Sequence, residues 1–422
     1  MEEFQVKSSI GFARFFRAVL PAFLLAVSVG QIYAFTVFSD PIAQRLAHGD
    51  AAAAAAMRPQ VQFAFSLGIF FLGMGAAFFG KIVERNIRLS TLIGTTLFLT
   101  GLAVTAVGVK FESLALIYLG YGFLLGTGTG IIYISPVKTM MMWFPNAKAI
   151  AAAVPIISFG LGSSLCTLLY KGFGWSSRLF TLRFEGFEIF DITTVFYVFA
   201  AFYAVPMVIS ALILRKPRSH QLTFGNDIPS LEFSYMRLAL DSYFLRIWLF
   251  MFLNISCGLC LIPLAKQLMA TVPSYSEGFV TFVLTMMGLM NGAGRFLFAW
   301  WSDHLARRIN IMLILLAISA GVMFTSFVPV LLAIGLIVIP ACYGAGFSVL
   351  PAVLADHYGM TNISKIHGAA LSAWGVAGLV GNQVALPVFK GWGLAGVATL
   401  LVAGYTLNFI NVLTLRRHRA VK

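Results

Sequence analysis

Arg295 is the one ionisable residue in the apolar stretch between Glu277 and Asp303. Its guanidinium stays protonated at any ordinary pH, and placing it near the middle of a membrane helix costs about 2.5–3.5 kcal/mol on insertion scales. Such a cost is usually offset by a fixed carboxylate or a bound anion. No apolar segment of the chain carries an Asp or Glu in its core. The sequence therefore predicts an anion site at Arg295, with a carboxylate, which a guanidinium binds bidentately, as the favoured group.

Asn291 lies four residues before Arg295, which puts both side chains on one face of a helix. The amide can orient the guanidinium or bind the anion, and a hydrogen bond to a neighbouring helix is the alternative role. About 12 Å of helix separates Arg295 from Asp303, a long way for a side chain to snorkel. This predicts a site slightly to the cytoplasmic side of the membrane midplane.

The composition indicates a membrane protein. Of 422 residues, 59% are hydrophobic, only 10% are charged and 40 are Phe, whereas a soluble domain carries roughly a quarter charged residues. This balance excludes the soluble and nucleic-acid-binding classes, and it predicts an all-α membrane protein.

Apolar runs of about 20 residues, long enough to cross a bilayer as a helix, occur twelve times. The predicted spans are 15–36, 60–80, 89–109, 113–135, 148–170, 193–214, 244–265, 278–301, 309–328, 330–353, 367–389 and 394–414. The first run is long and no small-residue cleavage site follows it, so we expect an uncleaved helix rather than a signal peptide.

The basic residues predict the orientation. The chain has 29 Lys and Arg against 15 Asp and Glu, a formal charge of +14. With the N-terminus inside, most of the basic residues fall in the tails and the even-numbered loops, which follows the positive-inside rule. We expect a multi-pass plasma (bacterial inner) membrane protein, surrounded by lipid, with both termini cytoplasmic. The charge then needs no nucleic-acid partner.

The twelve runs divide into two halves, predicted as domains 1–214 and 244–422, joined by a cytoplasmic linker at 215–243. The halves are weakly repeated: Ser135-Pro136 ends the fourth run, and Leu350-Pro351 ends the tenth. Two repeated six-helix halves with a site at the midplane are the architecture of secondary transporters. The chain contains no Walker P-loop that would indicate an ATPase, and we expect a monomer.

Several segments, in order along the chain, carry a family resemblance. They are 31–41, 61–67, 128–133, 143–145, 159–162, 291–295 and 302–303. By these segments the chain resembles the major facilitator superfamily, and within it the oxalate–formate antiporter and monocarboxylate transporter branch. The resemblance implies two pseudo-symmetric six-helix halves and secondary transport of small carboxylate anions by alternating access.

The resemblance also implies site residues. In carboxylate transporters Tyr hydroxyls donate to the anion, and Tyr33, Tyr133 and Tyr343 lie near the middle or inner third of their runs; an interfacial belt is the alternative. Four further residues are expected to line the cavity, with simple packing as the alternative: Gln62, Phe159, Phe347 and Trp374. A charged gate is expected at the cytoplasmic helix ends, with solvated surface charges as the alternative: Glu84, Arg85, Asp303, Arg307 and Arg308.

Two departures from the family's pattern bear on the substrate. Members that resemble animal lactate transporters often have an Asp at the position of Asn291, so proton coupling through that residue is not available here. Members that resemble the oxalate exchanger carry a Lys near the position of Trp374, which leaves Arg295 as the one fixed cation unless Lys266 supplies another. One cation balances one carboxylate best. We therefore predict a monocarboxylate (pyruvate, lactate or formate), moved by proton symport or anion exchange.

Other functions are less well supported by the sequence. An oxalate/formate-type dicarboxylate exchanger and an efflux pump for other organic solutes are the alternatives. An enzyme would need a catalytic cluster, but the six His lie in loops or at the ends of apolar runs. Cys257 and Cys260 have CxxC spacing with no His or acid nearby, so we expect neither a metal site nor a cofactor.

Overall fold

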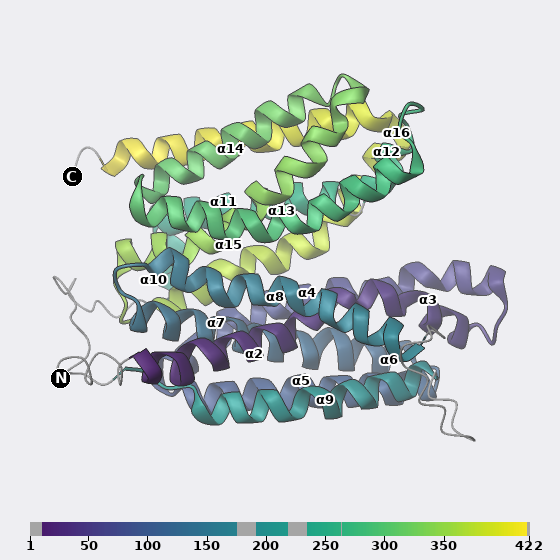
Figure 1. Cartoon of the computed structure of the whole chain (residues 1–422), viewed down its shortest axis with the longest axis horizontal. Helices are drawn as coiled ribbons and strands as arrows, with labels where there is room; N and C mark the ends of the chain where they lie inside the picture. Colours follow the sequence, from purple (N-terminus) through teal and green to yellow (C-terminus); the bar gives the residue numbers. More distant parts are fainter. Residues whose placement is uncertain (1–10, 175–190, 218–233, 263, 420–422) are drawn as a thin grey trace. The chain divides into compact units, whose positions relative to one another are not determined.

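The computed structural model describes residues 11–174, 191–217, 234–262 and 264–419. Every regular element within these ranges is a helix (Figure 1). A bilayer offers no water to a spanning backbone, so a helix, which satisfies its own N–H and C=O groups, is the expected element. The predicted all-α class is thereby confirmed.

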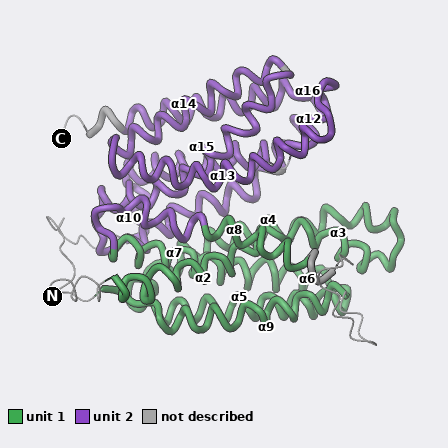
Figure 2. Tube along the Cα trace, in the orientation of Figure 1, with its two compact units in different colours: residues 1–143, 158–222 green, residues 144–157, 223–422 purple. Residues whose placement is uncertain are grey.

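The helices form two compact units, coloured separately in Figure 2. Unit 1 comprises Met1–Trp143 and Ser158–Leu222, and unit 2 comprises Phe144–Ile157 and Thr223–Lys422. The helix α8 (Lys148–Gly174) contributes to both units, because its residues up to Ile157 group with unit 2. This early part of α8 contacts α13 (Glu277–His304), the helix that carries Arg295.

Unit 1 begins with one continuous helical segment, Gly11–Leu46, that changes its winding along its length. Its parts are the π-helix η1 (Phe15–Val19), α2 (Leu20–Val29), the 3₁₀ stretch η2 (Gly30–Ala34) and α3 (Phe35–Leu46). The other elements are α4 (Ala51–Arg85), α5 (Ile87–Lys110), α6 (Leu114–Ile117), the π-helix η3 (Tyr118–Leu125), α7 (Gly126–Trp143), the later part of α8, and α9 (Ile192–Ile213).

Unit 2 contains the early part of α8 and the helices that follow unit 1 in the chain. These are α10 (Tyr235–Leu240), α11 (Ser242–Leu261), α12 (Ala265–Met269), α13 (Glu277–His304), α14 (Arg308–Thr325), the 3₁₀ turn η5 (Pro329–Leu331), α15 (Leu332–Tyr358) and α16 (Ile363–Arg419). The helix α13 carries Arg295. The N-terminus of α13 is stabilised in two ways. The Ser276 hydroxyl accepts from the Phe279 N–H at 3.2 Å, and Glu277 lies at the positive end of the helix dipole.

Eleven helices in the described ranges are long and apolar enough to cross a membrane. The last, Ile363–Leu415, has 53 residues, which is about 80 Å of helix against a hydrocarbon core of about 30 Å. A kink at Gly393, whose φ of 60° favours glycine, divides it. The predicted runs 367–389 and 394–414 lie on either side of this kink, so each of the twelve predicted runs coincides over most of its described length with a helix.

The first two helices extend further than their apolar runs predicted. Residues 37–46 and 51–59 were expected outside the spans, yet α3 continues to Leu46 and α4 begins at Ala51. The Asp50 carboxylate caps α4 by accepting from the N–H groups of Ala52 at 2.8 Å and Ala53 at 3.2 Å. The alanine run that follows is the strongest helix-forming composition available, so helix forms here without an apolar run.

Candidate functional site

The side chain of Arg295 belongs to the buried stripe of α13. The buried residues of that helix are Val283, Met287, Gly294, Arg295, Ala299 and Ser302. Apart from the adjacent pair Gly294 and Arg295, they recur at intervals of three, four or seven residues, which places them on one helix face. Arg295 is 8% exposed, so the charge predicted in an apolar run is indeed packed inside the protein.

Three neutral groups surround the guanidinium of Arg295. Its Nε donates to Oδ1 of Asn291 at 3.1 Å, one turn earlier on α13. Its Nη1 donates to the main-chain oxygen of Ile156 on α8. Its Cζ lies 5.7 Å from the ring centroid of Phe347 on α15, within the range of a cation–π contact. Among the described residues, Nη2 has no hydrogen-bond partner and no carboxylate pairs with this cation.

Phe347 is the middle ring of three neighbouring aromatic side chains, Tyr343, Phe347 and Trp374, which we call the aromatic wall. The ring centroid of Phe347 is 5.4 Å from that of Tyr343, one turn earlier on α15, and 4.7 Å from that of Trp374 on α16. All three side chains are buried. The structure thus places five of the predicted site residues in one connected group: Arg295, Asn291, Tyr343, Phe347 and Trp374.

The helices α13 and α15 approach closely at this group. Gly344 follows Tyr343, and a Cβ on it would lie 2.4 Å from the main-chain oxygen of Asn291 and 3.0 Å from Cγ of Arg295. Only glycine allows this approach, because the atom that a Cβ would meet belongs to the main chain of Asn291 and cannot move aside by changing rotamer. The position of Arg295 against the aromatic wall therefore depends on residue 344 being glycine, which has no side chain.

Unit 1 holds a second group of predicted residues. The ring centroid of Phe159 on α8 lies 5.6 Å from that of Tyr33 and 5.4 Å from that of Tyr133, both edge-on. The Tyr33 ring also lies 5.7 Å from that of Phe65 on α4. Gln62 is exposed on α4. Three of the four predicted residues of this half therefore come together.

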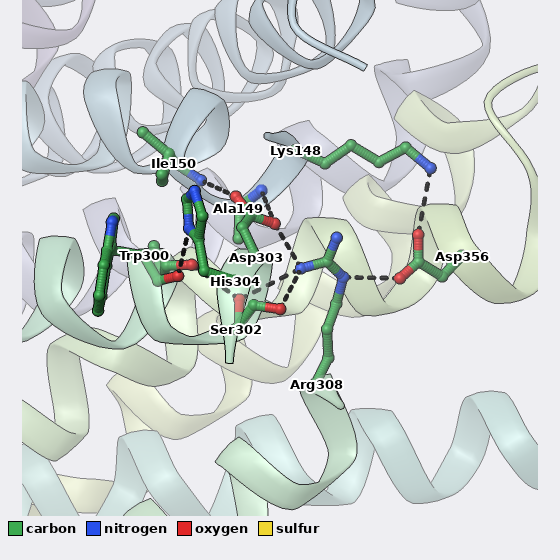
Figure 3. A network of polar contacts seen from close by, with 10 residues as sticks. Lys148, Ala149, Ile150, Trp300, Ser302, Asp303, His304, Arg308 and Asp356 are labelled. Carbon is green, nitrogen blue, oxygen red and sulfur yellow. Dashed lines mark hydrogen bonds and ion pairs between the residues drawn. The ribbon is translucent and has the colours of Figure 1, made fainter. Parts of the chain in front are cut away.

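Asp303, at the end of α13, caps the start of α8 (Figure 3). Its carboxylate oxygens accept from the N–H of Ala149 at 3.2 Å and of Ile150 at 2.8 Å. An acid is favoured here by the helix dipole and the unpaired N–H groups of the first turn. With 1% of its side chain exposed, Asp303 makes a buried, charge-assisted cap.

Two basic residues and a second acid complete this network (Figure 3). Arg308 donates from Nη1 to Asp303 and from Nε to Asp356, both at 2.6 Å. Lys148, the first residue of α8, donates to the other oxygen of Asp356 at 3.1 Å. We call Lys148, Asp303, Arg308 and Asp356 the α8 clasp. It ties the start of α8 to the ends of α13 and α15.

The predicted gate residues have different surroundings. Glu84, near the end of α4, forms an ion pair with Lys138, a buried residue of α7. The main-chain oxygen of Glu84 also accepts from Nζ of Lys216 at 2.8 Å, and burial lowers the pKa of that ammonium. Arg85 and Arg307 are exposed, and neither side chain joins these networks within the described residues.

Sequence reasoning missed three charged partners and one acceptor. Lys138 lies just beyond the predicted span 113–135, Lys148 begins the span 148–170 and Asp356 lies just beyond the span 330–353. A charge close to the end of an apolar run was therefore the available signal. The Ile156 carbonyl carries no side-chain signal at all. In the described ranges, no three His, Cys, Asp or Glu side chains are placed to hold a metal ion.

Comparisons with known proteins agree with this architecture. The Major Facilitator Superfamily model matches residues 10–382. The uncharacterised MFS-type transporter YhjX of Escherichia coli strain K12 is 23% identical over 361 residues, covering 83% of each chain. The oxalate:formate antiporter of Oxalobacter formigenes is 22% identical over 423 residues, covering 97% of this chain and 93% of that one.

The solved structure of the E. coli fucose:proton symporter FucP has the same fold, with a TM-score of 0.66 at 15% identity over 94% of this chain and 99% of that chain. The family match spans all the candidate site residues of both units. The chain belongs to the major facilitator superfamily, and it is a membrane transporter rather than an enzyme.

Proposed function

We propose that the protein transports small carboxylate anions and that Arg295 is the fixed cation that binds them. One observation carries this proposal. A permanently charged guanidinium is 8% exposed, and its described partners, Asn291, Ile156 and Phe347, are all neutral. An uncompensated buried charge is costly, and a bound anion supplies the compensation. The remaining Nη1 and Nη2 hydrogens form a fork that matches a carboxylate.

A monocarboxylate such as pyruvate, lactate or formate fits this charge best. Trp374 packs against Phe347 where oxalate exchangers, by resemblance, carry a second cation. Lys266 is exposed on the short helix α12, and Arg308 and Lys148 are engaged by acids in the clasp. A single cation then favours a single negative charge, moved by proton symport or by exchange.

Oxalate–formate exchange is the second candidate. Its support is the relative from Oxalobacter formigenes, whose name is oxalate:formate antiporter and whose length this chain almost entirely covers. Exchange also fits Asn291, since the residue beside Arg295 is an amide that takes no part in proton coupling. The difference between the two candidates is the charge of the preferred substrate.

The transport cycle needs a gate, and we infer that the α8 clasp and the Glu84–Lys138 pair provide it. Both lie at helix ends that the positive-inside rule assigns to the cytoplasm. We further infer that halves 1–214 and 244–422, joined by 215–243, form a monomer in the plasma membrane with both termini inside.

A counterflow screen tests this function. Purified protein in liposomes preloaded with one candidate should accumulate that labelled compound, with pyruvate, lactate, formate, acetate and oxalate each assayed with and without a pH gradient. Fucose and xylose serve as uncharged controls. We expect counterflow with monocarboxylates, weaker counterflow with oxalate and none with the sugars. Counterflow with a sugar but with no carboxylate would refute the proposal, and a preference for oxalate would favour the second candidate.

A further inference from the structure

The helices α8 and α13 are joined at two levels within unit 2. Near the middle of α13, Arg295 donates to the main-chain oxygen of Ile156; at its end, Asp303 accepts from Ala149 and Ile150. The two contacts are eight residues apart on α13 and six to seven apart on α8, which is about 12 Å and 10 Å of helix. Because these lengths are similar, the two helices run side by side between the contacts. They run in opposite directions, because the later contact on α13 is the earlier one on α8.

Small residues fill the space between these levels. Ala149, Ala153, Ala299 and Ala352 are all buried and pack in one cluster. Ala299 lies midway between Arg295 and Asp303, and Ala153 lies midway along the facing stretch of α8. Alanine has no side-chain rotamers to adjust, so we expect a shift of α8 at the clasp to reach Ile156 rather than to be absorbed by flexible side chains.

The position of Ile156 matters because it fixes the direction of the guanidinium. Asn291 holds Nε, and the Ile156 oxygen holds Nη1. Without the second acceptor, the only hydrogen bond to Arg295 would come from its own helix, and the side chain would regain rotamers, whose loss on binding reduces affinity. With both acceptors, the fork formed by Nη1 and Nη2 is oriented before an anion arrives.

We propose that the main-chain carbonyl of Ile156 is a positioning group for Arg295, and that the α8 clasp raises substrate affinity by holding Ile156 in place. This inference rests on the proposed carboxylate function. The carbonyl uses one of the five guanidinium N–H groups, so it leaves the fork open and does not compete with a carboxylate. A charge network about 12 Å along α13 from Arg295 thus contributes to anion binding.

Equilibrium binding of labelled formate, pyruvate and oxalate to the full-length protein in detergent tests this link. Asp303→Asn keeps the size of the side chain but removes its charge, and we expect the Kd to rise about tenfold, as for loss of a hydrogen bond to a charged group. Asp303→Glu should keep the Kd within about threefold of the wild type. Arg308→Ala should weaken binding as Asp303→Asn does, whereas Lys390→Ala, which removes an exposed charge of the same unit outside the clasp, should not.

A cross-link separates positioning from a general loss of structure. In Asp303→Asn with Ala153→Cys and Ala299→Cys, a short thiol cross-linker should restore the wild-type Kd while blocking transport. Failure of the cross-link to form, or a Kd that stays high after it forms, would overturn the proposal. Tighter binding in Asp303→Asn would do the same, because it would make Ile156 a competitor. If Arg295→Gln itself binds normally, the proposed function fails; if only the clasp variants bind normally, this inference alone fails.

Discussion

The Nε atom of Arg295 donates to Oδ1 of Asn291 across 3.1 Å, one turn apart on the same helix. The acceptor is a neutral amide, so the contact orients the guanidinium without cancelling its charge. The Ile156 oxygen and the Phe347 ring add two more neutral contacts. The guanidinium of Arg295 therefore has a fixed orientation and a positive charge that no neighbouring described group neutralises, and an anion site requires both.

Replacing Asn291 by Asp should convert this contact into an internal ion pair. The new carboxylate then competes with the substrate for Arg295, and we expect uptake at neutral pH to fall by about tenfold or more. Asn291→Ala removes the acceptor without adding charge, and it should cost about 1 kcal/mol, roughly fivefold in affinity. Uptake into proteoliposomes compares the two, and an Asp variant as active as the wild type would show that Arg295 does not need its charge.

Gly344→Ala should disturb the site through the helix contact. The added methyl would lie 2.4 Å from the main-chain oxygen of Asn291, so α13 and α15 must separate, at a cost of about 1–3 kcal/mol. We expect lower thermal stability together with weaker binding. Gly288→Ala on α13 is the matched control, because a Cβ there meets nothing within 4 Å. Equal melting temperatures of the two variants would contradict the described packing.

The sequence predicted those features that the membrane imposes directly. A bilayer requires long apolar runs, so the helices were found, and Arg295 was conspicuous because so few charges interrupt them. Asn291 followed from helical spacing alone. Helix outside the apolar runs, as at residues 37–46, depends on capping and alanine content, and hydropathy does not report it.

Tertiary partners could not be predicted in the same way. Lys148 and Asp356 lie 208 residues apart in the chain and meet only through folding. Lys138 lies just outside a predicted span, and nothing in the local sequence indicates that the Glu84 carboxylate reaches it. The carbonyl of Ile156 exists in every residue type, so its role becomes visible only when the position of Arg295 is known.

Glu84→Gln should destabilise unit 1. Lys138 is 4% exposed and would lose its paired charge, and breaking a buried pair on one side costs about 3–5 kcal/mol. We expect a clear fall in the melting temperature of the purified protein, largely recovered by adding Lys138→Met. Arg85→Gln removes an exposed neighbouring charge and should change little. A Glu84→Gln variant as stable as Arg85→Gln would mean that the pair contributes nothing.

Trp374→Lys should change the preferred charge of the substrate. The ammonium would lie beside the aromatic wall and add a second cation near Arg295, so monocarboxylate uptake should weaken while oxalate becomes a substrate. Trp374→Phe controls for loss of the indole alone. Competition of oxalate against labelled formate measures the change, and unaltered selectivity in the Lys variant would argue against the single-charge explanation.

The central claim is that Arg295 binds the transported carboxylate, and uptake by Arg295→Gln tests it most directly. Gln keeps a hydrogen-bonding side chain but removes the charge, and Lys390→Gln removes an exposed charge of the same unit as a control. With both variants folded and reconstituted at equal density, we expect carboxylate uptake to be lost in Arg295→Gln and retained in Lys390→Gln. Undiminished uptake by a well-folded Arg295→Gln protein would contradict the account.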